Sequence, residues 1–114
     1  MPMIRVETNQ KVSDDTAKAL LADLSRLAAD SLGKPESYVM VALHPGQAML
    51  FAGTDAPLAY VEVKSIGLPT GQTKALSNAL CTFVHQRLGV DPSRVYIEFA
   101  APQGALWGWN GGTF

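Results

Sequence analysis

Two stretches of the chain place their apolar residues at the spacing of one helical face. In residues 13–32 these are Ala17, Leu20, Leu21, Leu24, Leu27, Ala28 and Leu32, and in residues 71–88 they are Leu76, Ala79, Leu80, Phe83, Val84 and Leu88. A glycine and then a proline follow each stretch, as is common where helices end. The pattern therefore predicts two amphipathic helices of similar length.

Four shorter stretches, residues 3–7, 38–43, 58–66 and 95–99, are apolar or alternate between apolar and polar side chains, which is typical of β-strands. Each predicted helix lies between two of them, so each half of the chain forms a strand, a helix and a strand. Such a unit joins its two strands in parallel through a right-handed crossover. We therefore expect an α+β fold in which two βαβ units form one four-stranded mixed sheet with both helices on one face.

The alternation along these stretches also predicts what each face of the sheet contacts. The face toward the helices carries Ile4, Val6, Val39, Val41, Leu43, Ala59, Val61, Val63, Val95, Ile97 and Phe99. The opposite face carries Met3, Arg5, Glu7, Tyr38, Met40, Tyr60, Glu62, Lys64, Tyr96 and Glu98. This second set is too aromatic to be left in water and too charged to form a core. We therefore expect the protein to associate with copies of itself.

The composition narrows the class of protein. Its 114 residues suffice for one hydrophobic core, so residues 1–114 are expected to form a single domain. With 47% hydrophobic and 17% charged residues, the chain has the composition of a globular protein rather than a disordered one. Nine Lys and Arg residues against ten Asp and Glu residues leave no positive excess for binding nucleic acid or an anionic membrane.

Other sites and locations are disfavoured as well. Cys81 is the only cysteine, which excludes an intramolecular disulfide and an all-cysteine zinc site, and we expect no metal. No apolar run is long enough for a transmembrane helix, and the start of the chain lacks the features of a signal peptide. A cytoplasmic location is therefore expected, with leaderless export left open.

The start of the chain offers a candidate catalytic group. Met1-Pro2 is a context in which the initiator methionine is commonly removed, and removal leaves the secondary amine of Pro2 at the start of a predicted strand. An α-amino group titrates near 8, and burial or a nearby cation lowers its pKa enough to give a neutral base at physiological pH. The alternative is that Pro2 merely suits the start of a strand, and the dipeptide alone favours that alternative.

Lys34 is the second candidate. It lies just past the end of the first predicted helix, where a solvated lysine is the simpler interpretation. If strands 3–7 and 38–43 are neighbours, however, Pro2 and Lys34 lie at the same edge of the sheet. The ammonium group would then lower the pKa of the amine and hold an anionic substrate.

The remaining candidates are weaker. His44 and His85 have no partnered Ser, Cys or Asp at a suggestive spacing, so we expect them to be surface residues. Cys81 follows a buried helix position and is expected to pack in the core. Residues 107–114 carry three aromatic side chains among glycines, which fits either a packing tail or the wall of an apolar pocket.

Five motifs spread over the whole chain resemble the macrophage migration inhibitory factor family of the tautomerase superfamily. They are Met1-Pro2-Met3, Gly33-Lys34-Pro35, Ser65-Ile66-Gly67, the segment Asp91 to Ile97, and Gly108-Trp109-Asn110 with Thr113-Phe114. They occur in the family's order and with nearly its spacing. The resemblance implies the tautomerase fold, assembled as a homotrimer whose sheets line the middle.

The resemblance also implies the chemistry, which is keto-enol tautomerisation of phenylpyruvate-like α-keto acids without a cofactor. Pro2 would move a proton between carbon and oxygen, Lys34 would hold the substrate carboxylate, and Ser65 and Ile66 would complete that wall. The resemblance further implies that Met3, Tyr38, Tyr96, Trp109 and Phe114 line the pocket, with Tyr38 and Tyr96 coming from the neighbouring subunit.

Two residues depart from the family pattern. Glu98 stands where the best-known member has asparagine, and its carboxylate would oppose an anionic substrate. Trp107 replaces a smaller apolar residue at the rim of the pocket and would narrow it.

Two alternative functions stay open at this point. A cytokine-like protein that contacts a receptor through its surface, with vestigial catalysis, rests on family analogy alone. Hydrolysis or decarboxylation by a related superfamily member usually involves added arginines near the proline, and only Arg5 is near it here.

Overall fold

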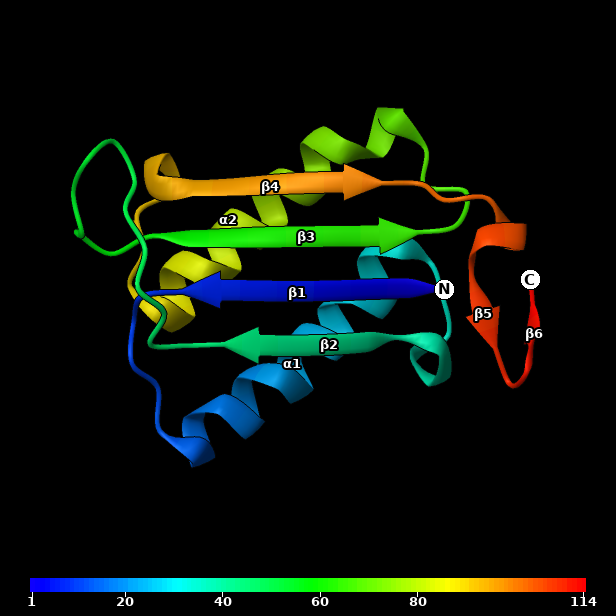
Figure 1. Cartoon of the computed structure of the whole chain (residues 1–114), viewed down its shortest axis with the longest axis horizontal. Helices are drawn as coiled ribbons and strands as arrows, with labels where there is room; N and C mark the ends of the chain where they lie inside the picture. Colours follow the sequence, from blue (N-terminus) through cyan, green and yellow to red (C-terminus); the bar gives the residue numbers. More distant parts are fainter.

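A four-stranded sheet organises the chain, and the computed structural model describes all of residues 1–114. The strands are β1 (Pro2–Thr8), β2 (Met40–His44), β3 (Ala59–Ser65) and β4 (Val95–Ala100), in the order β2-β1-β3-β4. The helices α1 (Asp14–Leu32) and α2 (Thr73–Leu88) both lie behind the same face of this sheet (Figure 1). No helix has the length and apolar character needed to cross a membrane.

The pairing of the strands confirms two βαβ halves in a mixed sheet. β1 is parallel to β2, β3 is parallel to β4, and the halves join through the antiparallel pair β1 and β3. In that central pair Pro2 lies opposite Ser65. The predicted α+β fold with both helices on one face is therefore confirmed.

Local signals account for the ends of the helices. The Ser13 side chain accepts a hydrogen bond from the Thr16 amide at 3.2 Å, which caps the start of α1. Gly33 ends α1 with φ of +63°, a conformation that glycine adopts without strain. α2 begins at Thr73 rather than at residue 71, because residues 70–72 form the 3-10 turn η2 (Thr70–Gln72).

The core lies between the sheet and the helices, and it is centred on the two inner strands. Its buried members include Ile4, Val6, Val61, Val63, Leu20, Leu24, Leu80 and Val84. Of the expected core positions on the outer strands, Val95 is buried, but the others, such as Val41 and Ile97, are only half-buried. They lie on edge strands, where one neighbour is missing and packing is one-sided.

Two short segments differ from the sequence-based expectation. Tyr38 ends a 3-10 turn, η1 (Glu36–Tyr38), so β2 begins two residues later than predicted, at Met40. The C-terminal aromatic run forms a hairpin of two-residue strands, β5 (Gly108–Trp109) and β6 (Gly112–Thr113). The hairpin lies at the end of the sheet where β1 begins (Figure 1).

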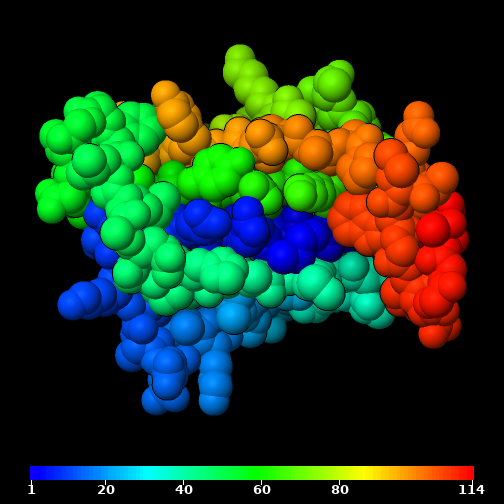
Figure 2. All heavy atoms as spheres, viewed as in Figure 1, coloured from blue at the N-terminus to red at the C-terminus, as the bar shows by residue number.

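The sheet face away from the helices carries a network of charges. Glu62 pairs with Arg5, with Nη2 and Oε1 2.9 Å apart, and with Lys64, with Nζ and Oε2 3.8 Å apart. The edge residues Met40 and Tyr96 are 65% and 67% exposed on this side of the chain. Figure 2 shows this face, with no helix over the strands.

Candidate active site

Two cavities lie next to the start of β1. The apolar cavity, about 290 Å³ in volume, is lined by Met1 and Pro2 together with Met3, Tyr38, Trp107, Trp109 and Phe114. The polar cavity, about 160 Å³ in volume, is lined by Lys34, Ser65, Ile66 and Gln72, with apolar neighbours. Pro2 borders the first cavity and pairs with Ser65 of the second, so it lies where the two meet.

The sheet topology holds Lys34 near the chain start. Gly33 caps the end of α1, and the Lys34 amide donates to the Ala29 carbonyl at 3.0 Å, which directs the chain back toward β2. Because β2 is parallel to β1, this loop reaches the same edge as Pro2. The Met1 amino group shows the effect: burial and, after it, the charge of Lys34 lower its pKa.

Ser65 contributes a hydroxyl that the chain itself does not use. Its side chain faces the core side of β3 and is 1% exposed, yet its Oγ has no hydrogen-bond partner. A buried hydroxyl without a partner is unfavourable, and nearly all such groups in proteins find one. A polar ligand in the cavity would supply the missing bond.

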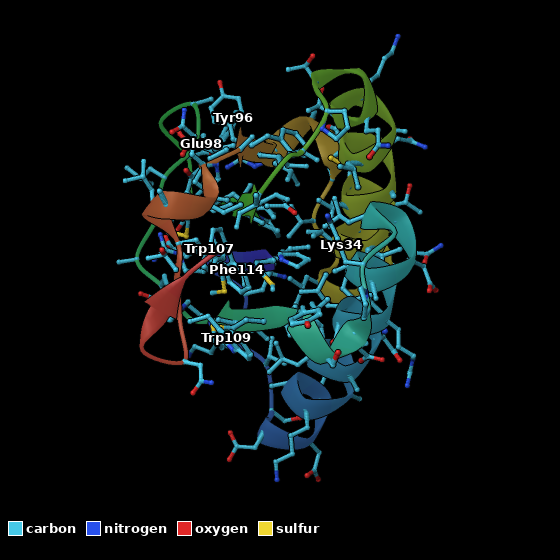
Figure 3. The ribbon with its side chains drawn as sticks, turned by 90° about the vertical axis from the view of Figure 1, so that its right-hand side faces the viewer. Lys34, Tyr96, Glu98, Trp107, Trp109 and Phe114 are labelled. Carbon is cyan, nitrogen blue, oxygen red and sulfur yellow. The ribbon has the colours of Figure 1, made fainter.

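An aromatic wall closes the apolar cavity. The rings of Trp109 and Phe114 stack with centroids 5.7 Å apart, and the ring of Tyr38 meets Trp109 edge-on at 6.4 Å. The Phe114 amide donates to the carbonyls of Gly104 and Trp107, which holds the hairpin in place. In Figure 3 the labelled residues of this wall lie on the C-terminal segment, whereas Lys34 lies on the helix side of the sheet.

The structure does not bring all of the expected residues together. Tyr96 is far from Pro2 within one chain. It pairs with Tyr60, and Tyr60 pairs with Glu7, which lies five residues, or about 16 Å along β1, from Pro2. Glu98 lies opposite Glu62 in the same sheet face and lines neither cavity. The family resemblance implied that Tyr38 comes from the neighbouring subunit, but Tyr38 lines the apolar cavity of its own chain.

Sequence reasoning missed several residues that line the cavities, among them Met40 and Gln72. Met40 lines the apolar cavity because it pairs with Met3 across β1 and β2, and its outward position in an alternating stretch was the available signal. Gln72 lines the polar cavity from the 3-10 turn before α2, and nothing in its sequence neighbourhood marks it. The structure contains no group of three or more His, Cys, Asp or Glu side chains placed to hold a metal ion.

The family comparison agrees with this geometry. The model of the macrophage migration inhibitory factor family matches residues 1–114. The chain belongs to this family. It is 38% identical to macrophage migration inhibitory factor of Meriones unguiculatus and 39% identical to a homolog from Trichuris trichiura; it is covered completely in both alignments, which span 99% and 100% of those proteins.

A solved structure supports the same assignment. The macrophage migration inhibitory factor homologue from Prochlorococcus marinus superposes on the chain with a TM-score of 0.93 at 43% sequence identity, over 98% of each chain. The family fold and its place in the tautomerase superfamily therefore describe the whole length of the chain.

The turn before the C-terminal hairpin generates a prediction about the aromatic wall. A Cβ atom at Gly104 would lie 2.6 Å from the Phe114 carbonyl oxygen, so Gly104→Ala should push the last strand away and change the tryptophan fluorescence. It should also lower the free energy of unfolding by about 1–3 kcal/mol, measured with urea. Gly71→Ala is the matched control, because a Cβ there meets no atom within 4 Å. Equal fluorescence spectra and equal free energies of unfolding for both variants would contradict the close packing of Gly104 against Phe114.

Proposed function

We propose that the protein catalyses keto-enol tautomerisation of aromatic α-keto acids of the phenylpyruvate type, with the amine of Pro2 as the acid and base. The observation that supports this most strongly is the position of Pro2 between a polar cavity with Lys34 and an apolar cavity with an aromatic wall. A substrate with a carboxylate at one end and an aromatic ring at the other matches this division.

The reaction needs only one group that accepts and returns a proton. The neutral Pro2 amine removes a proton from the carbon next to the keto group, the electron pair of that bond forms the carbon–carbon double bond, and the keto oxygen gains the negative charge. The protonated amine then gives the proton to that oxygen. Lys34 holds the carboxylate throughout, and the hydroxyl of Ser65 is available as a further donor to it.

The surroundings favour a neutral amine. In the chain with Met1 present, burial and then the charge of Lys34 lower the pKa of the terminal amino group. Pro2 is more buried than Met1 and follows it directly in the chain, so after removal of Met1 burial and the charge of Lys34 would both act to lower the pKa of its amine. With Met1 in place the Pro2 nitrogen is an amide and has no useful basicity.

The proposed enzyme is a homotrimer. Tyr96 and Glu98 are far from Pro2 within one chain, and both lie on the sheet face that no helix covers. Contact between sheets of neighbouring copies would cover part of this face and carry Tyr96 and Glu98 toward the cavity of the next copy. The substrate site would then be complete only in the assembly.

Removal of Met1 is the direct test of the proposed function. Protein that has lost Met1, verified by mass spectrometry, should tautomerise phenylpyruvate, and protein that retains Met1 should be slower by at least about 100-fold, because an amide nitrogen cannot act as the base. The two forms should have the same circular dichroism spectrum. Full activity with Met1 confirmed intact would rule out the proline mechanism.

Lys34 should act on both binding and pH dependence. Lys34→Gln removes the cation that lowers the pKa of the amine, so the pKa should rise and the acidic limb of the kcat/KM profile should move to higher pH. The KM for phenylpyruvate should rise by about tenfold as the carboxylate loses its partner. Lys18→Gln, an exposed change on α1, is the control and should alter neither. A KM increase with an unshifted pH profile would separate Lys34 from the amine.

Glu98 should act in the opposite sense if it reaches the neighbouring cavity. It has no ion pair in its own chain, since Arg5 and Lys64 pair with Glu62. Glu98→Gln removes a charge that would raise the pKa of the amine, so activity should begin at lower pH, and KM should fall about fivefold. Asp30→Asn, on the exposed side of α1, is the matched loss of one charge. An unchanged KM and pH profile would place the carboxylate away from the site.

A further inference from the structure

The loop between β2 and β3 receives four hydrogen bonds from one arginine of the other half of the chain, in addition to the bond from Asn9 Nδ2 to the Asp55 carbonyl (2.8 Å). Arg94 ends the 3-10 turn η3 (Pro92–Arg94). It donates from Nε to the Pro57 carbonyl (3.0 Å), from Nη1 to that of Phe51 (3.2 Å), and from Nη2 to those of Thr54 (3.1 Å) and Ala56 (3.0 Å). It has no carboxylate partner, so its donors are committed to this loop. Four carbonyls around one planar group require the fork of an arginine.

The loop needs this support because its turn is strained. Phe51 and Thr54 exchange two main-chain hydrogen bonds, of 3.0 and 3.1 Å, around Ala52 and Gly53. Ala52 has φ of +52°, which is unfavourable for a residue with a Cβ atom. The bonds from Arg94 to the turn and to the residues after it offset this strain and restrain the loop.

The loop in turn supports an aromatic ring of the sheet. The guanidinium carbon of Arg94 lies 5.2 Å from the centroid of the Phe51 ring, and that ring lies 4.8 Å from the ring of Tyr96 at an angle of 51°. Tyr96 stands on edge strand β4 and is 67% exposed, so Phe51 is the aromatic contact that restricts its orientation within the chain.

We propose that Arg94 is a positioning residue for the substrate site, acting through Phe51 to fix the ring of Tyr96. The inference rests on the proposed function, in which Tyr96 enters the cavity of a neighbouring copy. A ring that already points in one direction loses less conformational entropy when substrate binds against it, so its support lowers KM. Without the hydrogen bonds from Arg94, the loop would hold Phe51 less firmly, and Phe51 would in turn restrict the ring of Tyr96 less.

Arg94→Lys tests this directly, because lysine keeps the charge and loses the planar fork. We expect the KM for phenylpyruvate to rise about tenfold with kcat unchanged within about twofold, since a misplaced wall weakens binding without touching the base. The matched control is Arg87→Lys. Arg87 also lies over a phenylalanine ring, that of Phe83 at 5.3 Å, and it links the helices through Asp23 on the far side of the sheet. Its kinetics should stay those of the unmodified protein.

The same substitution in a protein that lacks Tyr96 distinguishes a positioning role of Arg94 from a general loss of structure. In a Tyr96→Leu protein, adding Arg94→Lys should change KM by less than twofold, because the residue it acts through is gone. A tenfold effect that persists in this background overturns the proposal. So does a lowered kcat with an unchanged KM for Arg94→Lys alone, which is the signature of less folded enzyme.

A readout independent of catalysis decides the case if no turnover is found. The chain has three tyrosines, so fluorotyrosine labelling gives three ¹⁹F resonances that Tyr→Phe variants assign. Arg94→Lys should shift and narrow the Tyr96 resonance, leaving that of Tyr38 in place. An unmoved Tyr96 resonance overturns the inference. Absence of turnover in unmodified protein without Met1 refutes the proposed function instead, and the Tyr96 resonance still tests the positioning.

Discussion

The burial of β1 between two neighbours is the constraint on which the rest of the structure depends. Chain termini usually fray, but here the first strand has a parallel partner in β2 and an antiparallel partner in β3 along its length. The pairing holds Pro2 opposite Ser65 and packs Ile4 and Val6 into the core. A terminal amine could act as a positioned base only on such a strand, because a free end would lose orientation in water.

The two cavities follow from the same strand. On the helix side of β1, the loop after α1 places the cation of Lys34 at the polar cavity. On the other side, the C-terminal segment places the rings of Trp109 and Phe114 at the apolar cavity. Lys34 would serve twice in the proposed mechanism. After burial, its charge lowers the pKa of the terminal amine, and the same ammonium group would attract the substrate carboxylate. The charged and the apolar parts of the proposed site therefore lie on opposite sides of Pro2, the residue that would act as the base.

Sequence reasoning succeeded where the signal is local or governed by handedness. Ser13 and Gly33 mark the ends of α1, and the helical crossover between β1 and β2 makes these strands parallel, which is why it was predictable that Pro2 and the loop of Lys34 lie at the same edge of the sheet. It failed at Tyr38, where a 3-10 turn displaced the strand by two residues, and it left the hairpin open because strands of two residues carry no periodicity. Long-range support such as that of Arg94 leaves no local pattern at all.

The antiparallel junction of two similar halves separates residues that the proposed site would combine. Each half turns from its helix into its outer strand through a 3-10 turn, and these turns end at Tyr38 and Arg94. Because β1 and β3 run in opposite directions, the two turns lie at opposite ends of the sheet. Tyr38 packs on Trp109 beside Pro2, whereas Arg94 supports Phe51 at the far end. The two ends of one sheet are too far apart to border one cavity within a chain, so the proposed site would need the second end from a different copy.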